Sequence, residues 1–248
     1  MSLLAFLRRY RLAAFLFSFC LSAVLLFADK AVSTQPLGTN SPLLTAQKTT
    51  APAEETPLAT TENVRKTVLE NGLTVLTKEV HTAPVVTAQV WYRIGSRNEE
   101  PGVNGIAHQL EHMMFKGTTN RPIQFGRLFS ALGSESNAFT SYDQTAYYGT
   151  VERHKLKSLL VLEADRMHNS LINPEQLENE KRVVISELQG YENDPGYRLS
   201  RAVMRAAFPD IPYGLPVGGT KADVEKFTVE QVRSYYRNYY SPDNATVI

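Results

Sequence analysis

The sequence predicts an α+β domain in which an antiparallel-rich sheet has helices packed on one face. Short runs rich in Val, Thr, Tyr and Phe come first from residue 63 onward, and such runs are typical of strands. Longer stretches with apolar residues at helical spacing mostly come later. Strands that come first and helices that gather afterwards favour an α+β fold over an alternating one.

Five strands and the beginning of a sixth are expected. Residues 64–80 hold two alternating runs on either side of Asn71-Gly72, a dipeptide that favours hairpin turns. Residues 85–96 predict a central strand, and residues 134–151 predict two further strands. The last residues, 245–248, look like the first half of another strand.

Helices are expected over most of the remaining folded part. Gly133 is placed to end one of them, and Pro174 is suited to the first turn of another that runs to about Gly190. The expected helices cover residues 105–115, 121–133, 155–171, 174–190, 197–207 and 222–238.

Composition narrows the classes of function. The chain has 248 residues, of which 43% are hydrophobic, enough for one sizeable domain or two small ones. Its 26 basic and 25 acidic residues give a net charge of +1. This balance lacks the excess of basic residues that is typical of nucleic-acid-binding proteins. Cys20 is the single cysteine, so a disulfide within the chain and a thiolate metal site are excluded. Histidines and carboxylates would have to hold any metal ion.

The N-terminal residues, 1–31, have the pattern of a secretory signal. Arg8, Arg9 and Arg11 precede an apolar run over residues 12–27. We expect export to the bacterial periplasm or cell envelope, with the signal cleaved or kept as a membrane anchor. A mitochondrial presequence is disfavoured because it would be amphipathic. Residues 32–62 are rich in Thr, Pro and Ala and predict a flexible spacer.

The stretch "GIAHQLEHMMF", residues 105–115, places polar groups in an apolar helix. His108 and His112 lie about 40° apart on one helical face, with Glu111 beside them. The apolar neighbours predict a buried helix, where an ionised carboxylate costs several kcal/mol unless something compensates it. Zinc would compensate the charge, and the order H-x-x-E-H inverts the H-E-x-x-H motif of metalloproteases. The alternative is that the histidines are hydrogen-bonded core residues.

A zinc site with two histidines needs a third protein ligand. Glu180 and Glu187 are seven residues apart on the predicted helix over residues 174–190, so they share one face. Either glutamate is a candidate on this spacing, and both could instead be solvated surface charges.

Four segments together resemble one known family. They are "GSRNE" (95–99), "GIAHQLEHMMFKGT" (105–118), "SNAFTSYDQTAYY" (136–148) and "ENEKRVVISELQGYENDP" (178–195). In this order they resemble the pitrilysin/insulinase family of zinc metallopeptidases, which includes the mitochondrial processing peptidases and bacterial relatives. The resemblance covers residues 63–248 and implies an N-terminal metallopeptidase domain of the LuxS/mitochondrial-processing-peptidase-like type.

The resemblance also assigns roles to residues. It implies one Zn²⁺ per chain, held by His108, His112 and Glu187, with Glu111 as the general base that activates the zinc-bound water. Glu180 would support the site without binding the metal. The substrate would lie along an edge strand at Asn137, Ala138, Phe139 and Thr140. Asn137 could position the substrate, or be an ordinary residue at the start of a strand.

The implied function is zinc-dependent hydrolysis of peptide bonds in extended peptides or unfolded segments. Family members carry a second, homologous domain that helps to bind substrate, so we expect residues 63–248 to be truncated at their C-terminal end. We expect the chain to bind zinc but to be weak or inactive until a second domain or subunit completes the cleft. A non-catalytic assembly or binding subunit is the alternative, and a zinc-dependent hydrolase or lyase of small molecules is a weaker one.

Overall fold

The computed structural model describes residues 62–248. The predicted signal and almost all of the predicted spacer lie outside the described residues. Within the described part, no helix combines the length and the apolar character that a membrane crossing requires.

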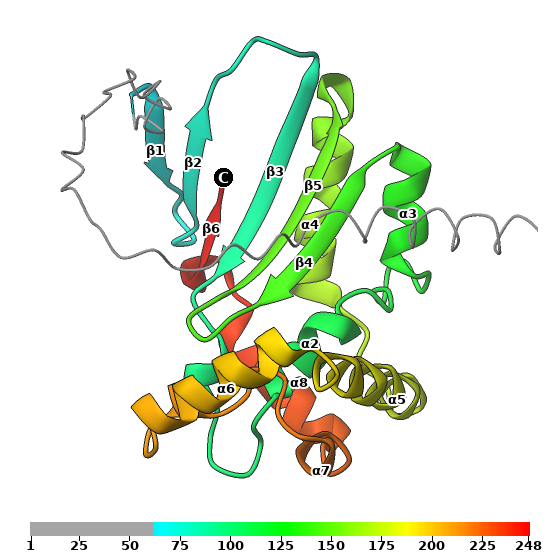
Figure 1. The fold of residues 1–248 in the computed structure, drawn as a ribbon. Coiled ribbons are helices and arrows are strands. Elements are labelled where there is room, and N and C mark those ends of the chain that lie inside the picture. Colours follow the sequence, from blue (N-terminus) through cyan, green and yellow to red (C-terminus); the bar gives the residue numbers. More distant parts are fainter. Residues whose placement is uncertain (1–61) are drawn as a thin grey trace, which may run out of the picture. The chain divides into compact units, whose positions relative to one another are not determined.

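A six-stranded mixed sheet forms the framework (Figure 1). Its strands lie in the order β1-β2-β6-β3-β5-β4, and all neighbours are antiparallel except β2 and β6. The predicted α+β class with a largely antiparallel sheet is therefore confirmed. The strands are β1 (Val64–Val68), β2 (Thr74–Lys78), β3 (Val85–Tyr92), β4 (Glu135–Thr140), β5 (Thr145–Glu152) and β6 (Ala245–Val247).

The predicted hairpin joins β1 to β2, with Val68 opposite Thr74. Its loop holds residues 69–73, so it is longer than the two-residue turn that Asn71-Gly72 favours. The last strand, β6, lies between β2 and β3, which places the final residues of the chain inside the sheet.

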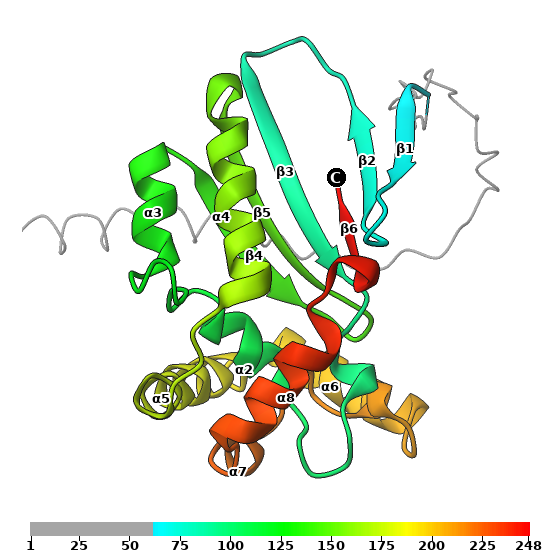
Figure 2. The same ribbon diagram turned by 180° about the vertical axis from the view of Figure 1, so that it is seen from behind.

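The helices form two groups around the sheet. α3 and α4 cover one face of the sheet, as Figure 2 shows, while the others gather beyond one end of the strands. The α-helices are α2 (Ile106–Met113), α3 (Phe125–Leu132), α4 (Leu156–Asn169), α5 (Pro174–Tyr191), α6 (Pro195–Ala207), α7 (Lys221–Val224) and α8 (Val229–Tyr239). The 3₁₀ turns are η2 (Ser96–Asn98), η3 (Arg153–Lys155), η4 (Pro212–Gly214) and η5 (Pro242–Asn244).

Two predicted helices differ from the structure. The helix expected over residues 121–133 begins only at Phe125 and ends at Gly133, whose φ of 71° is left-handed. The helix expected over 222–238 is divided into α7 and α8. It breaks because Thr228 and Gln231 form a capping box at the start of α8, while Phe227 is buried just before it.

The core has two clusters with a buried cation beside both. One cluster packs the sheet against α2, α5 and α8, and the other packs it against α3 and α4. Arg166 of α4 is 2% exposed and pairs with Glu163 at 2.5 Å. Its guanidinium lies 4.2 Å from the ring centre of Tyr147 and 5.3 Å from that of Phe129, which belong to different clusters. The Arg166 guanidinium therefore contacts both clusters.

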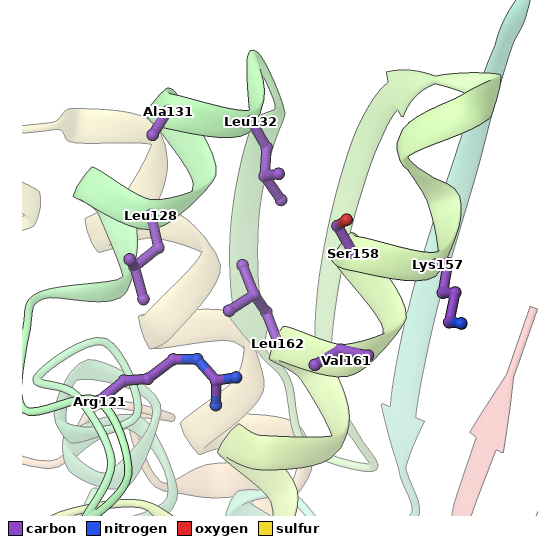
Figure 3. Close-up of a pocket in the computed structure, with 8 residues that line it drawn as sticks. All are labelled: Arg121, Leu128, Ala131, Leu132, Lys157, Ser158, Val161 and Leu162. Atoms are coloured by element: carbon purple, nitrogen blue, oxygen red, sulfur yellow. The ribbon is translucent and has the colours of Figure 1, made fainter.

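A cavity of about 440 Å³ lies between α3 and α4 (Figure 3). Aliphatic side chains such as Leu128, Leu132 and Leu162 line it, with Arg121 and Lys157 among the lining residues. None of its lining residues belongs to the cavity that contains the histidines.

Candidate metal centre

The start of α2 is fixed by an acidic side chain from the preceding segment. The Glu99 carboxylate accepts hydrogen bonds from the backbone N–H groups of Gly105, at 2.8 Å, and Ala107, at 3.0 Å. These N–H groups have no partner within the helix, and the positive end of the helix dipole favours an anion there. Glu99 thus sets where the histidine-bearing helix begins.

Three predicted ligands converge between α2 and α5. Each of His108, His112 and Glu187 offers one ligand atom, and these atoms lie within 4.8 Å of one another. The Glu187 Oε2 atom is 3.1 Å from His112 Nε2 and 3.8 Å from His108 Nε2. In residues 62–248, no other group of three such side chains meets this condition. Two imidazoles and a carboxylate are a known donor set for catalytic zinc.

Glu180 lies behind His112, on the side away from Glu187. Its Oε1 atom is 3.0 Å from His112 Nδ1, and its other oxygen forms an ion pair with Lys116. With Nδ1–H donating to Glu180, the Nε2 lone pair of His112 points toward the cluster. Glu180 is not among the three clustered ligands.

The two histidines differ in their protonation. Burial, together with the neighbouring His112, lowers the pKa of His108 to about 4. Burial also acts to lower the pKa of His112, but hydrogen bonds with Glu180 and Glu187 outweigh it and raise that pKa to about 9. At neutral pH without metal, His112 therefore carries an extra proton, which a metal ion would displace.

Glu111 faces the same cavity and is almost fully buried, at 9% exposure. Burial raises its pKa, and the hydrogen bond from Thr140 only partly opposes that shift. The Thr140 Oγ1 atom donates to Glu111 Oε2 at 2.6 Å. One carboxylate oxygen is therefore held in place, which leaves Oε1 for another partner.

β4 is an edge strand that runs beside this centre. It pairs with β5 on one side and with no described strand on the other. Asn137 and Ala138 line the cavity of about 510 Å³ that contains His108, Glu111, His112 and Glu187. Thr140 reaches Glu111, whereas Phe139 is 38% exposed and packs edge-on against Trp91 at 5.5 Å between ring centres. Three of the four predicted substrate-binding residues thus border the centre, and Phe139 does not line the cavity.

Further residues at the centre carried no predicted role. The Tyr191 hydroxyl donates to Glu187 Oε1, and this bond raises the pKa of Tyr191 to about 12. Its position four residues after Glu187 on α5 was the available signal, since such residues are neighbours on a helix. Glu99 and Lys116 lie within the recognised motifs, yet nothing in their spacing shows what they contact.

Gly218 packs directly against a histidine of the cluster. A Cβ atom at this position would lie 3.2 Å from His108 Nδ1 and 2.7 Å from Leu188 Cδ2. His108 Nδ1 is buried without a hydrogen-bond partner among the described residues. The backbone at Gly218 therefore limits the orientation of the His108 ring by close packing. The sequence pattern does not predict this contact.

Sequence comparison finds zinc proteases. Residues 74–221 match the model of the insulinase family, peptidase family M16. An uncharacterized zinc protease of Streptomyces coelicolor is 34% identical over 185 residues, covering 74% of this chain and 40% of that protein. The uncharacterized zinc protease YmxG of Bacillus subtilis is 33% identical over 186 residues, covering 74% and 45%. The chain thus spans less than half the length of these relatives.

Structural comparison agrees. A protease from Helicobacter pylori superposes with a TM-score of 0.71 at 32% identity, covering 74% of this chain and 45% of that one. The first half of the periplasmic protease PqqL from Escherichia coli superposes with a TM-score of 0.70 at 26% identity, covering 75% and 42%. The family match spans more than half of the chain and includes the segment that carries both histidines and Glu187. The chain therefore belongs to the insulinase family of peptidases, family M16.

Proposed function

We propose that this chain is the zinc-binding domain of a metalloendopeptidase that cleaves extended peptides or unfolded segments. The observation that carries the proposal is the meeting of His108, His112 and Glu187 within 4.8 Å. A buried carboxylate, Glu111, lines the same cavity. The zinc-protease names of the relatives support the same chemistry.

The residues present fit a catalytic zinc ion. His108, His112 and Glu187 would hold it, and Glu180 would orient His112 from behind. A zinc ion held there supplies a Lewis acid for the scissile carbonyl and lowers the pKa of an attacking water molecule. Three protein ligands leave a coordination position open, as a catalytic site requires.

Glu111 is the proposed general base. Thr140 holds its Oε2 atom, so Oε1 would accept the proton of the attacking water and deliver it to the leaving amine. Its near-complete burial raises its pKa and brings the carboxyl closer to the range in which it can both take and give a proton.

The edge of β4 is the proposed peptide-binding strand. Main-chain pairing along an exposed strand would fix the register of an extended substrate without strict choice of side chains. Asn137 and Ala138, which line the cavity, would face the substrate, and Asn137 would position its carbonyl or leaving amine. Phe139 would support the strand through Trp91.

We also propose that residues 63–248 are one domain of a larger peptidase, preceded by a spacer and an export signal. The chain covers 40% and 45% of its two relatives, and one similar structure is described as the first half of a protease. PqqL is described as periplasmic, which is consistent with the export predicted for residues 1–31.

Two substitutions separate the proposed base from the proposed ligands. Glu111→Gln should keep bound zinc and abolish hydrolysis of an unstructured fluorogenic peptide, because the metal ligands remain. Glu187→Gln should lower zinc content because it removes a ligand. Glu178→Gln is the matched control, since Glu178 lies on the same helix with 67% of its side chain exposed.

Zinc content and peptide hydrolysis are measured for each variant, with the chain alone and joined to the region that follows in its relatives. Unchanged turnover in Glu111→Gln would remove the base from the mechanism. Bound zinc without any hydrolysis in the joined protein would favour the non-catalytic subunit instead.

A further inference from the structure

A second, smaller cavity adjoins the metal centre. It measures about 200 Å³, below the roughly 300–1,000 Å³ of sites for drug-sized ligands, so it suits a single side chain. His108 and Tyr191 line both this cavity and the metal cavity. Thr140, at the end of β4, also lines it. A peptide that follows β4 past the metal centre would pass over its mouth.

The two cavities differ in charge. The metal cavity is lined by Glu111, Glu180 and Glu187. No aspartate or glutamate is found among the described residues that line the smaller cavity, and Arg201 is the one permanently charged side chain there. The smaller cavity is therefore suited to an anion, whereas the carboxylates of the metal cavity are suited to a cation.

Arg201 is held in place by groups that do not neutralise it. Its Nη1 atom donates to the carbonyl of Leu215 at 2.9 Å and to the hydroxyl of Tyr142 at 3.3 Å. Its Nη2 atom donates to the carbonyl of Gly214 at 2.9 Å. A guanidinium group has five N–H donors, so these three bonds leave two without a partner in residues 62–248. No carboxylate in that part of the chain forms an ion pair with Arg201.

The rest of the lining suits the stem of a side chain rather than its charged end. Tyr142, Tyr197, Leu188 and Val217 surround the space next to Arg201. Aromatic and aliphatic walls favour the methylene groups of an acidic side chain, while the oriented guanidinium favours its carboxylate. A fixed guanidinium forms such bonds with little further loss of side-chain freedom.

We propose that this cavity, the Arg201 subsite, receives a glutamate or aspartate side chain of the substrate close to the scissile bond. This inference rests on the proposed peptidase function and adds a substrate class to it. It assigns Arg201 as a specificity-determining residue and leaves the chemistry of bond cleavage to the metal centre.

The test compares peptides whose other residues are all uncharged and that carry a single Glu, Gln or Lys, moved through successive positions. Binding to the zinc-loaded Glu111→Gln chain, which should not cleave them, is measured by fluorescence anisotropy. At one position the Glu peptide should bind about tenfold more tightly than the Gln peptide, and the Lys peptide most weakly. Arg201→Glu, made in the same background, should invert this order. Arg198→Gln, on the exposed side of the same helix and outside the cavity lining, should leave it unchanged.

The inverted order separates specificity from folding. Loss of the bonds to Gly214 and Leu215 would weaken binding of all three peptides alike and would not reverse their order. Thermal unfolding and zinc content of each variant complete the comparison. Equal binding of Glu, Gln and Lys at every position would overturn the Arg201 subsite. Hydrolysis of these peptides by the unsubstituted chain joined to the region that follows in its relatives would still keep the peptidase proposal. Peptides that the chain does not bind and that the joined protein does not cleave would overturn both.

Discussion

At the scale of single residues, the candidate ligands depend on neighbours that would not bind the metal. His112 is positioned by Glu180, Glu187 is positioned by Tyr191, and His108 is confined by close packing. Such partners hold a ligand in one orientation before the metal arrives, so they reduce the entropy lost on binding. Their loss should change metal affinity without removing the site.

The substitution Glu180→Gln tests whether the partner of His112 changes metal affinity. The amide oxygen of Gln can still accept from His112 Nδ1, but the charge that pairs with Lys116 is lost. We expect zinc to bind roughly 10- to 100-fold more weakly, as is typical when such partners are changed. Competition with a chromophoric chelator measures the affinity, with Glu178→Gln as the control. Complete loss of zinc would instead make Glu180 a ligand, and unchanged affinity would deny it any role at the site.

At the scale of elements, Gly218 and Gly219 pack against the start of α2, and Gly218 also packs against His108. Gly218→Ala should lower zinc affinity, because the added methyl group would press on the His108 ring and on Leu188. Gly190→Ala is the matched control, since a Cβ atom at Gly190 of α5 meets nothing within 4 Å and alanine favours a helix. Zinc affinity and thermal midpoint are measured for both. A Gly218→Ala protein with unchanged zinc affinity would show that the close packing does not position His108.

The segment between α2 and α3 is tied to α4 through Asp165. Burial alone would raise the pKa of the Asp165 carboxyl, but hydrogen bonds from four side chains outweigh it and lower that pKa from 3.8 to about 2. The donors are Thr118, Asn169, Asn120 and Arg121. Because the folded-state pKa is lowered, the stabilisation is fully present above about pH 4 and is lost as the pH falls through 2.

Asp165→Asn should therefore reduce the free energy of unfolding at neutral pH by roughly 2 kcal/mol. The difference from the unsubstituted protein should shrink as the pH is lowered from 4 toward 2, because the native carboxyl then becomes protonated too. Chemical denaturation across this range measures it, with the exposed Asp210→Asn as the control. A difference that stays constant with pH would mean that the charge of Asp165 is not what stabilises the segment.

The strands and helices show what local pattern can predict. Periodicity placed α4 and α5 close to their observed bounds, because each buries one regular face. Alternating or β-branched runs between turn residues did the same for the five longer strands. Periodicity joined α7 to α8, since the break depends on the burial of Phe227 and on a cap at Thr228. The candidate ligands followed from motif and spacing, whereas the roles of Glu99, Gly218 and Arg201 follow from contacts that cross from one helix or loop to another. Contacts of this kind produce no regular pattern in the sequence, so periodicity cannot predict them.

At the scale of the whole domain, the candidate site has one wall built by α2, α5 and β4. A peptide on the edge of β4 would be held along one side by main-chain bonds. Catalysis needs the scissile bond to be held to within about an ångström, and one edge provides few contacts for that. The relatives are more than twice as long as the matched part of this chain, so we propose that their remaining part supplies the opposite wall.

The 248-residue chain should accordingly bind zinc with the affinity of the larger protein but hydrolyse peptides weakly or not at all. The ligands all lie within residues 108–187, whereas positioning of the substrate would depend on the second wall. Zinc content and kcat/KM on an unstructured fluorogenic peptide are measured for the chain alone and joined to the region that follows in its relatives. The joined protein should raise kcat/KM by at least about 100-fold, the loss that a small misplacement of substrate can cause. Robust hydrolysis by the chain alone, abolished by Glu111→Gln, would show instead that one wall is sufficient.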